Sequence, residues 1–347
     1  MKAITHFATR ILLFSLPGIL LVSCLGNTSL NNKEEKSDTV AKNVSATPKP
    51  PKKAKTNVIL EKHFTLASKG LIGKIKSITH LHYKFTEKLG KAQKMVESKD
   101  VELYNPDGYL VELQQYKSEG KPEGKFTYKF DAKGHDTETD YYKSGALYGK
   151  SIMKYDENGN EVEDNGYSAK GLLIRRTVYK YDEKGNVIEL NNYKEDGSMD
   201  MRFTYKYTDY GNKKMIFGYK PDASPYTTCT YEYDNDENIV ETDNYEYDGS
   251  IKNKWTSKFD NKGNKIEDDI YKTDEILDSK YTYKYDDKGN EVEVNSYQSN
   301  GNLETKGSYT KEYEYDKNGN MIRETKFTTK FGKPFPLESI ETEIVYY

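Results

Sequence analysis

An internal repeat governs how this chain can fold. The stretch Thr177–Gly197, TVYKYDEKGNVIELNNYKEDG, has the pattern of a strand, a tight turn, a second strand and a second turn. The pattern recurs in nine copies, and most copies follow the one before by 26 residues. A fixed period of this size is typical of a repeat protein, in which each unit buries its apolar surface against its neighbours. The first turn of each copy is marked by Gly108, Gly134, Gly159, Gly185, Gly211, Glu237, Gly263, Gly289 and Gly319.

Aromatic residues recur at fixed distances from that turn. One lies four residues before the turn position in all nine copies, and another often lies two residues earlier, as Tyr181 and Tyr179 do. Lys180 between them is charged. Because side chains alternate along a strand, this spacing predicts strands with one aromatic face and one charged face. A third aromatic residue lies eight residues after the turn position in every copy: Tyr116, Tyr142, Tyr167, Tyr193, Tyr219, Tyr245, Tyr271, Tyr297 and Phe327.

The turn sequence, Asp-x-x-Gly-Asn, has a physical reason of its own. It supplies a side chain that can hydrogen-bond the turn backbone, followed by residues that tolerate positive φ. The copy Asp156–Asn160 also resembles a calcium loop, which needs clustered oxygen ligands. However, the middle position of sibling turns is lysine, as in Lys184, Lys262 and Lys288. We therefore interpret these segments as tight turns.

These patterns predict an all-β fold. Tandem antiparallel β-hairpin repeats of about 26 residues are expected to form one long twisted or coiled sheet. The segment Lys74–Phe85 is predicted to be an opening strand, and Ser339–Tyr347 a last strand. One step is 30 residues long, and its four extra residues near Glu304–Ser308 predict a bulge or a longer turn.

The N-terminal segment has the pattern of a processing signal. Lys2 and Arg10 supply positive charge, and Ile11–Val22 is an apolar run of the length found in signal peptides. The sequence Leu-Val-Ser-Cys that ends at Cys24 resembles the lipobox of bacterial lipoproteins, in which the cysteine is lipid-modified and becomes the first residue of the mature protein. An ordinary secretory signal with a chance cysteine is the alternative.

The polar residues 25–56 have no apolar periodicity, which predicts a flexible tether. The predicted organisation is a lipoprotein signal peptide at 1–23, a lipidated tether at 24–56 and a β-hairpin repeat domain at 57–347. The whole chain has a formal charge of −3; residues 1–24 carry +2 and residues 25–56 carry +4, which leaves −9 for the repeat domain. An acidic domain argues against nucleic acid as a partner, because phosphate binding needs a basic surface.

The repeat resembles a known family. Tyr-Lys-Tyr-Asp-Glu-Lys-Gly-Asn at 179–186 and Tyr-Lys-Tyr-Asp-Asp-Lys-Gly-Asn at 283–290 are similar to the YD repeat of Rhs proteins. In large Rhs proteins such repeats coil into a β-sheet shell around a toxin, so the resemblance implies a coiled sheet. The Tyr…Gly…Lys spacing is also similar to the MORN-like repeats of small antitoxin or immunity lipoproteins.

The sequence shows no recognisable Ser-His-Asp set, phosphate loop or nucleotide fingerprint. His80 and His82 would share one face of a strand and could bind a metal together with His63. We prefer a strand-surface pair without a metal. The sequence therefore predicts no enzyme activity, no cofactor and no metal site.

Departures from the repeat are the better candidates for binding. Met215–Phe217 stands where glutamate is usual, Pro221–Pro225 replaces a second-turn glycine, and Trp255 lies in the next hairpin. We expect these three features to form one patch in the middle of the sheet. Aromatic residues are enriched at contact sites, so the predicted binding residues are Phe217, Tyr219 and Trp255. Most other tyrosines are predicted to be structural.

Cys229 occupies the same position in its repeat as Phe203 and Trp255, two residues before Tyr231. This position predicts a buried side chain that faces the apolar stripe. Since acylation would occupy Cys24, we also expect Cys229 to be a free thiol.

Three functions compete. The first is a non-catalytic binding or scaffold lipoprotein of the bacterial cell envelope, anchored in the outer membrane on its periplasmic or surface side, with an envelope polysaccharide or a protein as its partner. The second is an immunity or antitoxin-type lipoprotein that neutralises a toxin. The third is an enzyme that acts on envelope polymer, for which the sequence offers the least support.

Overall fold

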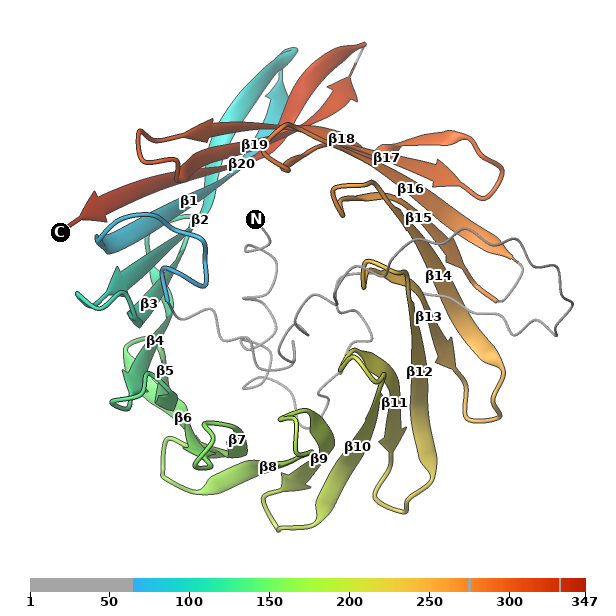
Figure 1. Cartoon of the computed structure of the whole chain (residues 1–347). Coiled ribbons are helices and arrows are strands. Elements are labelled where there is room, and N and C mark those ends of the chain that lie inside the picture. Colours follow the sequence, from blue (N-terminus) through green and yellow to red (C-terminus); the bar gives the residue numbers. More distant parts are fainter. Residues whose placement is uncertain (1–64, 274–275, 331) are drawn as a thin grey trace, which may run out of the picture.

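The structure is a computed structural model, and it describes residues 65–273, 276–330 and 332–347. These residues form one sheet of twenty antiparallel strands, in which each strand pairs with its neighbours along the chain (Figure 1). The predicted all-β fold of tandem hairpins is therefore confirmed. The signal peptide, Cys24, the tether and His63 lie outside the described residues. Within those residues, no helix has the length and apolar character needed to cross a bilayer.

Most strands are seven to ten residues long, whereas the first two and the last have 14 residues each. The strands are β1 (Ile75–Lys88), β2 (Lys91–Tyr104), β3 (Leu110–Lys117), β4 (Pro122–Phe130), β5 (Asp136–Lys143), β6 (Ala146–Tyr155), β7 (Glu161–Ser168), β8 (Leu173–Tyr181), β9 (Val187–Lys194), β10 (Met199–Tyr207), β11 (Lys213–Tyr219), β12 (Pro225–Tyr233), β13 (Ile239–Tyr245), β14 (Ile251–Phe259), β15 (Lys265–Tyr271), β16 (Leu277–Tyr285), β17 (Glu291–Gln298), β18 (Leu303–Tyr315), β19 (Met321–Lys330) and β20 (Lys333–Tyr346).

The sheet closes on itself. The last strand, β20, pairs with the first strand, β1, so that Ile78 lies opposite Ile344 and His80 opposite Thr342. Because β1 also pairs with β2, and β20 with β19, neither strand is left as an edge (Figure 1). The open, coiled sheet expected from the sequence is thus corrected to a closed one. The accumulated curvature of many twisted strands brings the two ends together, and closure removes two edges that would otherwise attract other chains.

The turns follow the chemistry predicted for them. Asp182 Oδ1 accepts hydrogen bonds from the backbone N–H groups of Lys184 at 2.9 Å and Asn186 at 2.8 Å. Asn186 Nδ2 donates to Asp182 Oδ2 at 2.8 Å, so both carboxylate oxygens are engaged. Gly185 closes the turn with φ 81°, a conformation that glycine adopts at little cost. The interpretation of this motif as a tight turn is confirmed.

A tyrosine hydroxyl joins each of several repeats to the repeat before it. Tyr181 donates to the backbone carbonyl of Glu161, and Tyr207 donates to that of Val187, both at 2.6 Å. The acceptor is a backbone atom, so the bond does not depend on the identity of the residue that carries it. The same bond recurs from Tyr155 to Asp136, from Tyr233 to Lys213 and from Tyr285 to Lys265, while Tyr313 reaches Glu291 across the longer step.

The four extra residues of the longer step form a bulge in β18. Val294 lies opposite Tyr309, while Ser296 lies opposite Glu304, so the residues between are left out of the pairing. Gly307 lies within this bulge, and a Cβ at that position would meet the Ser296 side chain at 2.7 Å. The bulge predicted from the sequence is confirmed.

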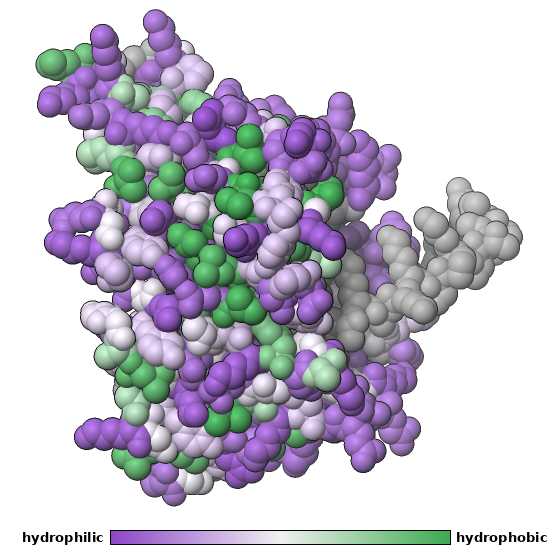
Figure 2. All heavy atoms as spheres, turned by 90° about the vertical axis from the view of Figure 1, so that its left-hand side faces the viewer, coloured by the Kyte–Doolittle hydropathy of each residue, from purple (hydrophilic) through white to green (hydrophobic). Residues whose placement is uncertain are grey.

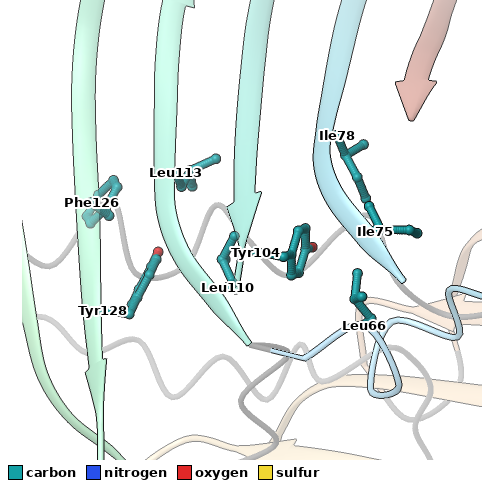
Figure 3. Close-up of a cluster of buried hydrophobic side chains, with 8 residues drawn as sticks. All are labelled: Leu66, Ile75, Ile78, Tyr104, Leu110, Leu113, Phe126 and Tyr128. Atoms are coloured by element: carbon teal, nitrogen blue, oxygen red, sulfur yellow. The ribbon is translucent and has the colours of Figure 1, made fainter. Parts of the chain in front are cut away.

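Buried apolar side chains gather in two clusters. The first extends from the start of β1 across to β4 and includes Ile75, Ile78 and Tyr104, with Leu66 packed beside them (Figure 3). The second is centred on Phe203 in β10 and also contains Val187, Leu190, Met201, Tyr205, Ile216 and Cys229. On the side of the molecule that carries the early strands, apolar side chains lie in small groups among polar ones (Figure 2). The core is therefore spread along the sheet, as the repeat predicts.

Cys229 is fully buried, as predicted. The expectation of a free thiol is wrong, because the described residues contain no free cysteine and Cys229 is disulfide-bonded. The repeat position determined its burial but held no information about its oxidation state.

Candidate functional site

One face of the sheet carries a ladder of cations over tyrosine rings; we call it the charged face, and the opposite one the aromatic face. Lys125 Nζ lies 4.7 Å from the ring centroid of Tyr142, its neighbour across the β4–β5 pair. Arg202 lies at the same distance from the ring of Tyr219. In seven of nine copies, a lysine or arginine stands opposite the tyrosine that lies eight residues after the turn. In at least five of these pairs the cation lies within 6 Å of the opposite ring centroid, and such contacts contribute about 0.5–1 kcal/mol each at exposed sites.

The ladder is interrupted in the middle of the sheet. Opposite Tyr245, the basic residue is replaced by Thr228. On the next strand, Met215 stands in a position that holds glutamate in seven copies, and Phe217 stands where the other copies have polar residues. Phe217 lies opposite Thr228, which in turn lies opposite Tyr245, so these changes fall together on the charged face.

These changes create a pocket of about 420 Å³. A long basic side chain would otherwise cover this part of β12, and the shorter Thr228 leaves the space open. The walls come from β11, β12 and the end of β13, and the exposed ring of Tyr247 stands at the rim. The lining residues used below are Met215, Phe217, Tyr219, Thr228, Tyr245 and Tyr247.

The polar groups at the pocket are few. Tyr245 donates its hydroxyl hydrogen bond to Asp243 Oδ2 at 2.9 Å, and burial raises the pKa of Tyr245 to about 12. Glu246 forms an ion pair with Lys252 at 3.0 Å, so its charge is balanced at the rim. Mostly apolar walls with a few polar groups are the usual features of a ligand pocket.

The structure separates the three predicted binding residues. Phe217 and Tyr219 both line the pocket, and Pro225 lies beside them. Trp255 instead lies opposite Thr242, which pairs with Tyr231, and this places Trp255 on the aromatic face. The expectation of one patch that includes Trp255 is therefore wrong. Side chains alternate between the two faces of a sheet, and the pairing of the strands puts Trp255 and Phe217 on opposite faces.

Sequence reasoning missed several lining residues, of which Thr228 and Tyr245 matter most to the argument. Thr228 could have been found by comparing its position among the repeats. Its repeat is one of only two described copies in which no basic residue stands opposite the aromatic residue. Tyr245 looks like every other member of its column in the sequence. It becomes a pocket residue only because its partner across the strand pair is short.

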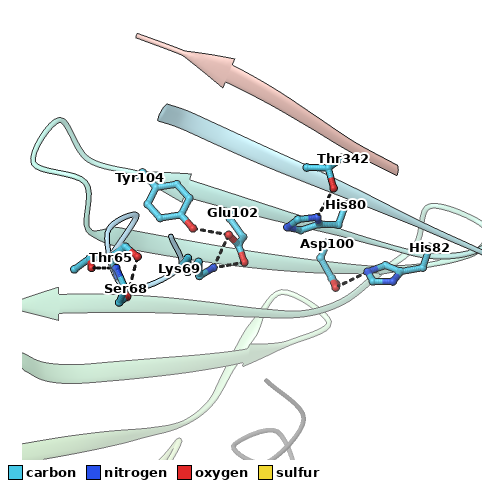
Figure 4. Close-up of polar contacts among 9 residues, drawn as sticks. All are labelled: Thr65, Ser68, Lys69, His80, His82, Asp100, Glu102, Tyr104 and Thr342. Atoms are coloured by element: carbon cyan, nitrogen blue, oxygen red, sulfur yellow. Dashed lines mark hydrogen bonds and ion pairs between the residues drawn. The ribbon is translucent and has the colours of Figure 1, made fainter. Parts of the chain in front are cut away.

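The two histidines of β1 do not share a ligand. His80 Nδ1 lies 3.0 Å from Thr342 Oγ1, and His82 Nε2 lies 3.2 Å from Asp100 Oδ2 (Figure 4). Burial lowers the pKa of His80, which favours its neutral form. Within residues 65–273, 276–330 and 332–347, no group of three histidine, cysteine, aspartate or glutamate side chains could hold a metal ion.

A buried ion pair lies beside these histidines. Lys69 Nζ lies 2.6 Å from Glu102, and the hydroxyl of Tyr104 donates to the same carboxylate at 2.5 Å (Figure 4). Burial by itself would raise the pKa of Glu102, but Lys69 and His80 outweigh it, so the pKa is lowered. These contacts fasten the segment before β1 onto β2, next to the junction where the sheet closes.

No protein-family model matches the sequence, and no curated protein matches it. Among solved structures, the chain is similar to TcdB2-TccC3, with a TM-score of 0.37 and 12% identity over 74% of this chain and 16% of that one. It is similar to a porin-like protein from Bacteroides uniformis, with a TM-score of 0.31 and 11% identity over 78% of this chain and 96% of that one. It is also similar to the Photorhabdus luminescens Tc holotoxin pore, with a TM-score of 0.29 and 11% identity over 67% and 15% of the two chains. Similarities at this level assign neither a family nor a function.

Proposed function

We propose that this protein is a non-catalytic binding module of the bacterial cell envelope, which holds a carbohydrate or protein ligand on the charged face of its sheet. The pocket at Phe217 is the observation that supports the proposal. Three independent departures from the repeat coincide there, on two neighbouring strands and one face. The lining holds apolar, aromatic and hydroxyl side chains with one glutamate, a set that suits contact with a ligand rather than proton transfer or nucleophilic attack.

The test compares two aromatic residues on opposite faces. We expect Phe217→Ala to weaken retention of the protein on an envelope-polysaccharide column, or its capture of a cross-linked envelope protein, by roughly 30-fold, the effect of losing an interface residue worth about 2 kcal/mol. Trp255→Ala is the matched control, because its side chain lies on the aromatic face. It should lower stability and leave retention of the folded protein unchanged.

Equal retention of wild type and the folded Phe217→Ala variant would contradict the binding role of this pocket. If the captured protein is a toxin that the chain inactivates, the immunity lipoprotein becomes the better assignment.

The proposed location in the cell envelope depends on Cys24, which lies outside the described residues. We propose that Cys24 carries lipid and anchors the mature chain, since multiple acylation gives stable attachment where a single acyl chain does not. We expect Cys24→Ser to release the protein from the membrane fraction and to remove the mass of the lipid. Unchanged fractionation and mass would contradict the anchor. The sequence holds only two cysteines, so a bridge between Cys229 and Cys24 would use the thiol that the acyl group needs, and a mass spectrum that shows this bridge would also contradict the anchor.

A further inference from the structure

The aromatic face holds a lysine without an acidic partner. Lys213 begins β11, directly after the turn that contains the exposed Tyr210. Its Nζ lies 5.4 Å from the ring centroid of Tyr205, and its backbone carbonyl accepts the hydrogen bond of Tyr233 at 2.6 Å. No carboxylate of the described residues forms an ion pair with it. Burial lowers the pKa of Lys213 to about 8, the direction expected for a desolvated amine that no nearby negative charge offsets.

The same chain shows how such a lysine is satisfied. Lys265 occupies the equivalent position two repeats later, and its Nζ lies 2.5 Å from Asp268 Oδ2. Tyr283 donates to the same oxygen at 2.7 Å, and Ser257 donates to the other oxygen of that carboxylate. One buried carboxylate therefore accepts from an ammonium group and two hydroxyl groups.

The repeat of Lys213 keeps the donors and lacks the acceptor. The residues that correspond to Lys265, Tyr283 and Ser257 are Lys213, Tyr231 and Tyr205, each of which retains a hydrogen-bond donor. The residue that corresponds to Asp268 is Ile216.

Tyr205 supplies a second, independent observation. The residue is 5% exposed, and its hydroxyl has no hydrogen-bond partner. Buried polar groups are normally paired, and an unpaired one is costly. The ammonium group of Lys213 and the phenol of Tyr205 are both donors. They lie close together where β10 ends and β11 begins, without an acceptor.

We propose that Lys213, Tyr205 and Tyr231 bind the carboxylate group of a small ligand, which takes the role that Asp268 plays for Lys265. A carboxylate fits because it accepts several hydrogen bonds and carries the charge that balances the ammonium group. The ligand enters from the end of the sheet, since Lys213 is only partly buried and follows a turn. This site lies on the face opposite the pocket at Phe217, so neither proposal depends on the other.

Acetate is the probe for the test. The rate at which an amine reagent acylates Lys213 in the full chain is measured by mass spectrometry, with Lys265 as the internal reference. A bound carboxylate holds the amine protonated, so we expect acetate to slow acylation of Lys213 about tenfold for each unit by which it raises the pKa. Acetate should leave the rate at Lys265 unchanged. Sodium chloride at equal ionic strength is the control for screening.

Two variants complete the test. Ile216→Asp supplies the carboxylate within the chain, so it should slow acylation of Lys213 without acetate and remove the response to acetate. Lys213→Met keeps the apolar surroundings and should abolish any rise in melting temperature that acetate causes in the wild type. The proposal is overturned if acetate leaves the acylation of Lys213 unchanged, or if chloride protects it equally well.

Discussion

Raising the pH through about 10 to 11 is expected to unfold this protein, although its carboxylates are already fully ionised well below that range. The cause is the buried tyrosines of the aromatic face. Burial raises the pKa of Tyr231 and of Tyr285 to about 12, and it also raises the pKa of Tyr205, Tyr207 and Tyr233.

The sign follows from proton linkage. A phenol in the unfolded chain loses its proton near pH 10, while the same phenol in the folded protein keeps it to a higher pH. The stabilisation is therefore fully present below about pH 10 and is lost as the pH rises toward the folded-state pKa. One pKa unit corresponds to about 1.4 kcal/mol, so five such tyrosines would together remove on the order of 5 kcal/mol by about pH 11. That loss approaches the whole stability of a typical domain, about 5–15 kcal/mol.

The measurement is a pH titration followed both by circular dichroism and by the absorbance of tyrosinate. Exposed tyrosines can ionise while the sheet is folded, so the part of the absorbance change that comes from the buried tyrosines should coincide with the change in circular dichroism, since these ionise only as the sheet opens. Tyr285→Phe removes one ionisable group and should move the midpoint to higher pH, even though it also deletes the hydrogen bond to Lys265. Smooth ionisation of the tyrosines in a sheet that stays folded would contradict the prediction.

Removing the last strand is expected to have an effect of similar size. A chain truncated after Gly332 lacks β20, which pairs with both β1 and β19. Ile75 and Ile78, now 0% and 1% exposed, would lose part of their cover, at about 1.5–3 kcal/mol for each side chain left in water. Two strand edges would also become free to pair with other chains.

We therefore expect the truncated protein to unfold at a much lower urea concentration and to associate as its concentration rises, which light scattering would detect. Val345→Thr is the control, because Val345 lies on the same strand but is 43% exposed, and surface substitutions usually change stability by less than about 0.5 kcal/mol. A truncated chain that remains monomeric with an unchanged midpoint would show that closure contributes little.

The sequence by itself determined the repeating unit. The aromatic, glycine and asparagine spacings identified the hairpins, the chemistry of the turn at Asp182 and the bulge near Gly307, and each is a local property of neighbouring residues along the chain. The burial of Cys229 followed from its position in the repeat for the same reason. Phe217 and Tyr219 could be singled out because a strict repeat makes any departure visible.

Only the tertiary structure decided which distant residues meet. Closure depends on the sum of many small twists, and no local spacing encodes that β20 will reach β1. Register across strand pairs decided that Trp255 lies on the face opposite Phe217, since a shift of one residue moves a side chain to the other face. The pocket itself arises because short Thr228 stands beside Tyr245, a relation between strands that appears only once they are paired.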